Sequence, residues 1–180
     1  RLLNLVNGQV DRLLGVDLVE QAIGMARAFN PQIEFFHGPV SQVKETFQCA
    51  ALIEVMEHIP DSEYPAVIEN VADVLVDQGV LVVSVPTVNL PLNAKHFRHY
   101  DLDILKGQLS CRFEVEKYWF LSKSDWISKI IRSMLINRFF VVRPASWRRF
   151  VWRLHKRFSF HAGERSGCLL YTSDAADEED

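Results

Sequence analysis

The chain has 180 residues, of which 48% are hydrophobic and 24% charged, the balance of a soluble globular protein. This composition excludes a wholly disordered chain, and three widely separated cysteines exclude a disulfide scaffold. The sequence has no run of 18 apolar residues and no leader-like start, so we expect no transmembrane helix and no secretory signal. Free thiols favour a reducing compartment, and we predict a cytoplasmic protein.

The charge falls into three blocks. Residues 1–128 carry ten basic and seventeen acidic residues, residues 129–165 carry ten basic and one acidic, and residues 166–180 carry five acidic and none basic. We therefore expect an acidic body, a basic segment and an acidic tail that differ in their partners.

Short apolar runs alternate with helical periodicity along the first 110 residues. The pattern predicts strands at 12–17, 33–36, 49–55 and 80–85, with helices at 19–29 and from about 61 to 75, where residues 77–79 end the helix. The run at 80–85 is apolar at nearly every position, which is typical of a central strand in a parallel sheet. A helix at 101–109, an edge strand at 113–120, helices at 124–136 and 144–158, and a last strand at 167–171 are predicted beyond it. This order indicates the α/β class.

Four segments carry a recognisable pattern: GVDLVEQAIGMA (15–26), AALIEVMEHIPD (50–61), VLVDQGVLVVSVP (74–86) and KHFRHYDLDIL (95–105). The first three resemble the class I S-adenosylmethionine-dependent methyltransferases, and the fourth is similar to a segment of the ubiquinone-biosynthesis O-methyltransferases. The resemblance implies a Rossmann-like, mostly parallel sheet flanked by helices, with S-adenosylmethionine as cofactor. It also implies one domain over residues 1–171, with a helical insertion at 121–165.

The sequence departs from this family at its start and at two acidic positions. The family's glycine-rich loop is absent, and Pro39 and Gln48 stand where the family commonly has acids. We therefore expect a fragment truncated at both ends, with residues 172–180 forming a disordered, non-native tail. A degenerate, non-catalytic binding module is the alternative that these departures favour.

The resemblance places cofactor binding at two strand ends and one turn. Open parallel sheets bind ligands beyond the carboxyl ends of their strands. A carboxylate at position 17 can accept two hydrogen bonds from a ribose diol, although Asp17 is also suited to cap the following helix. The turn at 38–40 is expected to line one side of the adenine-binding site. The acidic bend at 54–57 is expected to attract the positively charged sulfonium of the cofactor. The predicted cofactor-binding residues are Asp17, Leu18, Gly38, Pro39, Val40, Glu54, Val55 and Glu57.

Three histidines, His58, His96 and His99, are the candidate catalytic residues. Imidazole titrates near neutral pH, so it can take a proton from a hydroxyl as the methyl group is transferred. We therefore predict O-methylation of a small-molecule or lipid-linked acceptor, such as a glycan.

The sequence Glu-x-x-Glu-His at 54–58 also resembles the metal ligands of the small-RNA 2′-O-methyltransferases. Those enzymes need a further histidine downstream, at a place where this chain has Leu102. A divalent ion requires a complete set of ligands, so we predict no metal. RNA 2′-O-methylation stands as the second alternative function, and it would require a metal ion.

The segment WRRFVWRLHKRF (147–158) places apolar residues on one helical face and basic residues on the others. This pattern is that of a helix on a membrane surface, of a helix on RNA phosphates, or of an ordinary amphipathic helix packed on a sheet edge. Membrane contact implies a location at the inner face of the membrane, and nucleic acid is the least favoured partner.

Overall fold

The computed structural model describes Leu3, residues 6–123, Phe150, Arg153 and residues 161–162 and 166–175. The elements follow one another in the order β1 (Leu14–Asp17), α2 (Glu20–Phe29), β2 (Glu34–His37), η1 (Val40–Gln42), β3 (Phe47–Ile53), η2 (Met56–His58), α3 (Tyr64–Asp73), β4 (Leu75–Pro86), α4 (Leu102–Leu109), β5 (Phe113–Lys123), β6 (His161–Ala162) and β7 (Ser166–Ala175). The two short η elements are 3-10 helices.

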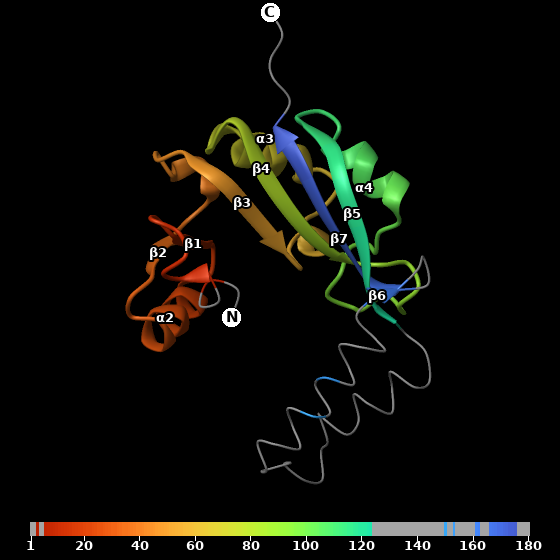
Figure 1. The fold of residues 1–180 in the computed structure, drawn as a ribbon, viewed down its shortest axis with the longest axis horizontal. Coiled ribbons are helices and arrows are strands. Elements are labelled where there is room, and N and C mark those ends of the chain that lie inside the picture. The colour runs from red at the N-terminus through yellow and green to blue at the C-terminus, as the bar shows by residue number, and fades with distance from the viewer. Residues whose placement is uncertain are drawn as a thin grey trace, which may run out of the picture.

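The described strands form two sheets. β1 and β2 pair in parallel in the smaller sheet, and the larger sheet has the order β3-β4-β7-β5-β6 (Figure 1). β3 and β4 are parallel, whereas β7 is antiparallel to both β4 and β5. The predicted α/β class is confirmed. Among the described strands, β1–β2 and β3–β4 pair in parallel, and β4–β7, β5–β7 and β5–β6 pair antiparallel.

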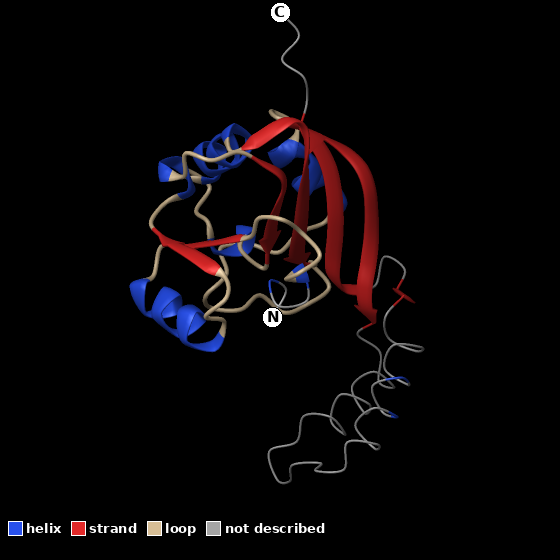
Figure 2. Cartoon of the chain, turned by 60° about the vertical axis from the view of Figure 1, so that its left-hand side comes forward, coloured by secondary structure: helices blue, strands red, loops and turns tan. Residues whose placement is uncertain are grey.

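The hydrophobic core lies between the larger sheet and helices α3 and α4. Alternate residues of β4 point into it: Leu81, Val83 and Val85 are fully buried, whereas Val82 is only half-buried. The other core residues are Met56, Ile68, Val71, Ala72, Leu75, Tyr100, Leu105, Leu109 and Phe113. Figure 2 shows α2 beside the smaller sheet and away from α3 and α4. The core therefore fixes the end of β4 and the chain that follows β3.

The helix predicted from about 61 to 75 is shorter than expected. α3 ends at Asp73, and Leu75 already pairs with Phe47 in the sheet. The residues predicted to end the helix form an irregularity within β4, where Gln78 has a left-handed φ of 57°. A Cβ on Gly79 would lie 2.7 Å from the carbonyl oxygen of Val76, so this position requires glycine. The residues predicted to end the helix therefore lie within strand β4.

The C-terminal predictions needed correction. β5 is not an edge strand, because it lies between β7 and β6. β7 continues to Ala175, so the expectation of a disordered tail was wrong for residues 172–175, whose backbone pairs with β4 and β5. The predicted helical insertion begins and ends in strand, since residues 121–123 belong to β5 and 161–162 to β6. The predicted helices at 124–136 and 144–158 lie outside the described residues, except for Phe150 and Arg153.

None of the helices in the described part of the chain is long and apolar enough to cross a membrane.

Candidate active site

The bend after β3 begins at Glu54, which has a left-handed backbone with φ of 54°. This conformation costs a residue other than glycine about 1–2 kcal/mol. Two contacts with Ser84 hold the bend: the Glu54 N–H donates to the Ser84 carbonyl at 2.8 Å, and the Ser84 hydroxyl donates to Glu54 Oε1 at 2.6 Å. The β4 strand therefore orients the exposed Glu54 carboxylate at the carboxyl end of the parallel strands.

Glu57 follows in η2 and is almost completely buried, with 1% of its side chain exposed. Its Oε2 atom has no hydrogen-bond partner among the described residues. Burial raises the pKa of Glu57, and the charge of nearby Glu54 raises it further. A buried carboxylate oxygen without a partner is rare in proteins and calls for a specific explanation.

The candidate histidines gather beside this bend. His58 Nδ1 lies 3.0 Å from the carbonyl oxygen of Lys95, and His99 Nδ1 lies 3.1 Å from that of Leu90. A carbonyl oxygen only accepts hydrogen bonds, so both Nδ1 atoms carry a hydrogen. In the neutral rings, the Nε2 atoms of His58 and His99 therefore carry lone pairs.

His96 lies between the other two rings. Its Nδ1 is 2.9 Å from His99 Nε2, and its ring meets that of His58 edge-on at a centroid distance of 4.7 Å. Since His99 Nε2 accepts, His96 Nδ1 donates, which leaves His96 Nε2 unprotonated. Burial lowers the pKa of His96, and neighbouring His58 and His99 lower it further. The ring is therefore neutral at pH 7 and presents a basic nitrogen.

The loop that carries His96 and His99 is attached to the bend by several contacts. The Phe97 N–H donates to the Glu57 carbonyl at 2.8 Å, and Thr87 forms a parallel bridge with Tyr100. Arg98 forms an ion pair with Asp61, which lies between η2 and α3. These contacts bring together the two predicted segments that carry histidines.

Tyr100 is a stability determinant of this loop. Its buried hydroxyl lies 3.1 Å from the Met56 carbonyl and 3.2 Å from Gln108 Oε1. We expect Tyr100→Phe to lower the free energy of unfolding by about 1 kcal/mol, because one of these two buried acceptors loses its donor. Urea unfolding should show an earlier midpoint with the same m value. Tyr118→Phe, at an exposed tyrosine, is the control, and equal midpoints for both variants would contradict the expectation.

Asp17 ends β1 and is exposed. Its Oδ1 accepts from the Val19 N–H at 2.8 Å, the local bond expected for a capping role, although the cap position of α2 is occupied by Val19. Its Oδ2 has no hydrogen-bond partner within the described part of the chain. One carboxylate oxygen therefore remains for a ligand. Neighbouring Leu18 is 69% exposed.

The turn at 38–40 lies next to Asp17. The Gly38 N–H donates to the Asp17 carbonyl at 3.0 Å, and a Cβ at Gly38, where φ is 144°, would lie 2.9 Å from the Phe36 ring. Pro39 is exposed, and Val40 packs against the core. The hydrogen bonds of Asp17 and Gly38 go to Val19 and to each other, and not to the bend at 54–58. The structure thus groups Glu54, Glu57 and the three histidines, and it holds Asp17 and Gly38 as a second group.

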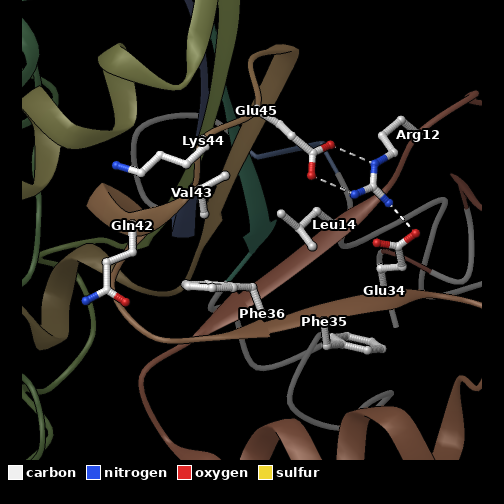
Figure 3. Close-up of a pocket in the computed structure, with 9 residues that line it drawn as sticks. All are labelled: Arg12, Leu14, Glu34, Phe35, Phe36, Gln42, Val43, Lys44 and Glu45. Atoms are coloured by element: carbon white, nitrogen blue, oxygen red, sulfur yellow. Dashed lines mark hydrogen bonds and ion pairs between the residues drawn. The ribbon is translucent and has the colours of Figure 1, made fainter.

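A cavity of about 270 Å³ lies elsewhere. Figure 3 shows Leu14 and Phe36 pointing into it and Arg12 pairing with both Glu34 and Glu45. These two carboxylates raise the pKa of Arg12. The cavity is lined mainly at the amino ends of β1 and β2 and before β3, so it does not contain the predicted site residues. A smaller, mostly apolar cavity of about 180 Å³ includes Asp17 in its lining.

Sequence reasoning missed Ser84, Arg98 and Tyr100 as site residues. Ser84 had a signal, since it is the single polar side chain in the run VLVVSV. Arg98 and Tyr100 had none, because their partners lie about forty positions earlier in the chain.

Comparison with known proteins places the chain among methyltransferases. A family model described as a methyltransferase domain matches residues 1–128, whereas no curated protein sequence matches. A SAM-dependent methyltransferase from Archaeoglobus fulgidus has a TM-score of 0.64 and 13% identity, covering 96% of this chain and 80% of that one. The N-methyltransferase NodS from Bradyrhizobium japonicum, in complex with S-adenosylhomocysteine, has a TM-score of 0.58 and 14% identity, covering 92% of this chain and 67% of that one.

A third similar structure is the 1,6-didemethyltoxoflavin N1-methyltransferase of Burkholderia thailandensis, with its acceptor and S-adenosylhomocysteine bound. Its TM-score is 0.60 at 17% identity, covering 97% of this chain and 65% of that one. At such identities the structural likeness shows the fold, and the family model, which spans more than two thirds of the chain, shows the family. The chain belongs to the methyltransferase-domain family.

Proposed function

We propose that this methyltransferase methylates a hydroxyl oxygen of a small-molecule acceptor. The histidine cluster carries the proposal, because His96 presents an unprotonated Nε2 beside the bend at the end of β3. A hydroxyl loses its proton as its oxygen attacks a methyl group, and a base placed within reach speeds that step. A small-molecule acceptor is supported by the toxoflavin methyltransferase, whose structure contains such an acceptor.

The described residues fit part of S-adenosylmethionine. Asp17 Oδ2 has no partner among them and is suited to accept a hydrogen bond from a ribose hydroxyl. The exposed side chains of Leu18 and Val55 supply apolar surface at the same two strand ends. When bound, the cofactor supplies a methyl group on a positively charged sulfur. The carboxylate of Glu54, fixed by Ser84, favours that positive charge.

In this proposal each group of residues has one task. Asp17, with the 38–40 turn beside it, holds the nucleoside end of the cofactor, and Glu54 favours the sulfonium. His96 Nε2 takes the acceptor proton, and His99 positions His96 by accepting from its Nδ1. The histidine loop is fixed to the bend through Phe97 and Glu57, so the acceptor oxygen and the base meet in a defined geometry.

Methyl transfer from S-adenosylmethionine labelled in its methyl group tests the proposal. The protein is incubated with matched acceptors that carry either a hydroxyl or an amine on the same scaffold. Labelled ethers are the expected product. Labelling of amines alone would overturn the O-specificity, and it is the relevant second outcome because NodS and the toxoflavin enzyme are N-methyltransferases. Labelling of RNA would instead favour the RNA alternative.

We also propose lipid-linked acceptors, reached through contact of segment 147–158 with a membrane surface. Support comes from its basic and apolar sequence pattern and from Phe150, which is 51% exposed. We expect the protein to float with anionic vesicles. Replacing the basic residues of this segment with glutamine should abolish this binding. Absence of binding to anionic vesicles would contradict it.

A further inference from the structure

We propose that Glu57, His58 and His96 bind a divalent transition-metal ion. One ligand atom from each of the three residues lies within 4.8 Å of the other two. Neither the family match nor the proposed function requires an ion here, and the sequence predicted none. Binding of the ion stands on its own, and only its part in methyl transfer rests on the proposed function.

The first argument comes from the hydrogens on the two rings. The Lys95 carbonyl fixes the hydrogen of His58 on Nδ1, and His99 fixes that of His96 on Nδ1. Each neutral ring therefore carries its lone pair on Nε2, and His58 Nε2 lies 3.9 Å from Glu57 Oε1. One ligand atom of each of the three residues lies close enough to the others for a single ion to bind all three. A cation satisfies three acceptors at once.

The second argument comes from the buried carboxylate. Glu57 is 1% exposed, and its Oε2 has no hydrogen-bond partner within the described residues. An ionised carboxylate in such a place is costly unless a positive charge compensates it. A bound divalent ion would supply that charge and occupy the free oxygen.

The donor set indicates the kind of ion. Two imidazole nitrogens and one carboxylate oxygen are ligands of Zn²⁺ and of related first-row ions such as Mn²⁺. Ligand atoms around a tetrahedral ion lie about 3.3 Å apart when the bonds are 2.0–2.1 Å long, so the side chains would close by roughly 1–1.5 Å on binding. Three protein ligands leave a position for water or an acceptor oxygen. A hydroxyl bound there would lose its proton more readily. Because coordination would use the free lone pair of His96, the ion would activate the hydroxyl in the ion-bound chain, and the general-base role of His96 applies to the chain without the ion.

This set differs from the one that the sequence suggested. Glu54 is engaged by Ser84 and lies outside the three-residue cluster. His96 supplies the third ligand, whereas Leu102, the position considered from the sequence, begins α4. His99 is the positioning residue behind His96, because the Leu90 carbonyl orients its ring.

Metal titration of the 180-residue chain tests the proposal. The chain is treated with chelator, dialysed, and titrated separately with Zn²⁺ and Mn²⁺ by calorimetry. We expect one ion per chain and a rise in Tm of roughly 5–10 °C at an ion concentration 100 times the Kd. His58→Gln and His96→Gln should each weaken binding at least tenfold. The matched control is His37→Gln, at an exposed histidine outside the cluster, and its Kd should equal that of the wild type.

Glu57→Gln separates loss of a ligand from loss of the fold. Without metal, this variant should have a Tm no lower than that of the wild type, because glutamine keeps the shape of glutamate and carries no charge for burial to penalise. With metal, it should show little rise in Tm. Binding of neither ion, or binding that the variants leave unchanged, would overturn the proposed site. S-adenosylmethionine binding and methyl transfer are measured separately, in excess chelator. Failure of the chain to bind an ion would overturn the metal site and leave the O-methylation proposal intact. Binding of an ion by a chain that transfers no methyl group to hydroxyls would overturn O-methylation and leave the metal site intact.

Discussion

His96→Ala is expected to lower kcat for O-methylation by roughly 10²–10⁴-fold, the usual contribution of a positioned general base. The His96 Nε2 atom is the basic nitrogen at the end of the chain that starts at the Leu90 carbonyl and passes through His99. The KM for S-adenosylmethionine should change little, because the residues proposed to hold the nucleoside belong to a different group. Initial rates at saturating cofactor and acceptor measure the loss.

The pH profile gives a second readout of the same residue. Burial and the neighbouring rings lower the pKa of His96 below its ordinary value of 6.5. A base acts only when unprotonated, so kcat should rise as the pH passes upward through a pKa below 6.5 and then level off. The control His37→Gln should keep both the kcat and the profile. A His96→Ala variant that retains the acidic limb and a kcat within threefold of the wild type would remove His96 from the mechanism.

Asp17→Ala is expected to weaken S-adenosylmethionine binding at least tenfold, equivalent to about 1.4 kcal/mol. The variant removes the carboxylate oxygen that has no partner among the described residues and that is proposed to accept from the ribose. Calorimetry measures the Kd. Asp103→Ala, at an exposed acid in the first turn of α4, controls for the loss of one negative charge.

The capping interpretation of Asp17 makes a different prediction, and Asp17→Asn separates the two. An asparagine side chain still accepts from the Val19 N–H, so the local structure is retained, but it offers one acceptor oxygen instead of two. If Asp17 binds ribose, the asparagine variant also loses affinity while its Tm stays close to that of the wild type. If it only caps, the asparagine variant binds normally and the alanine variant shows the lower Tm.

The strand ends could be predicted from the sequence because each follows a short apolar run and precedes a polar bend. Asp17 and Glu54 stand at such places, and the structure has β1 end at Asp17 and β3 end just before Glu54. The sequence could not predict that His58, His96 and His99 lie close together. His58 and His99 are held by the carbonyls of Lys95 and Leu90, and a backbone carbonyl carries no signal in the residue type.

Strand pairing at the C-terminal part of the chain is a second feature that local sequence patterns could not predict. Residues 172–175 carry no hydrophobic run and were expected to be disordered, but pairing with β4 and β5 on both sides gives their backbone its hydrogen bonds. The end of α3 shows the same effect, since pairing of Leu75 with Phe47 takes precedence over helical periodicity. In both places long-range strand pairing decides the structure, and local propensity does not.

The position of β7 also bears on synthesis at the ribosome. β4 and β5 are complete once residue 123 has been made, yet the strand that joins them extends to residue 175. During translation both strands keep open edges until that last segment emerges, and such edges pair readily with other chains. We therefore expect nascent chains stopped before residue 166 to depend on chaperones, whereas in chains that include β7 this strand pairs with both β4 and β5.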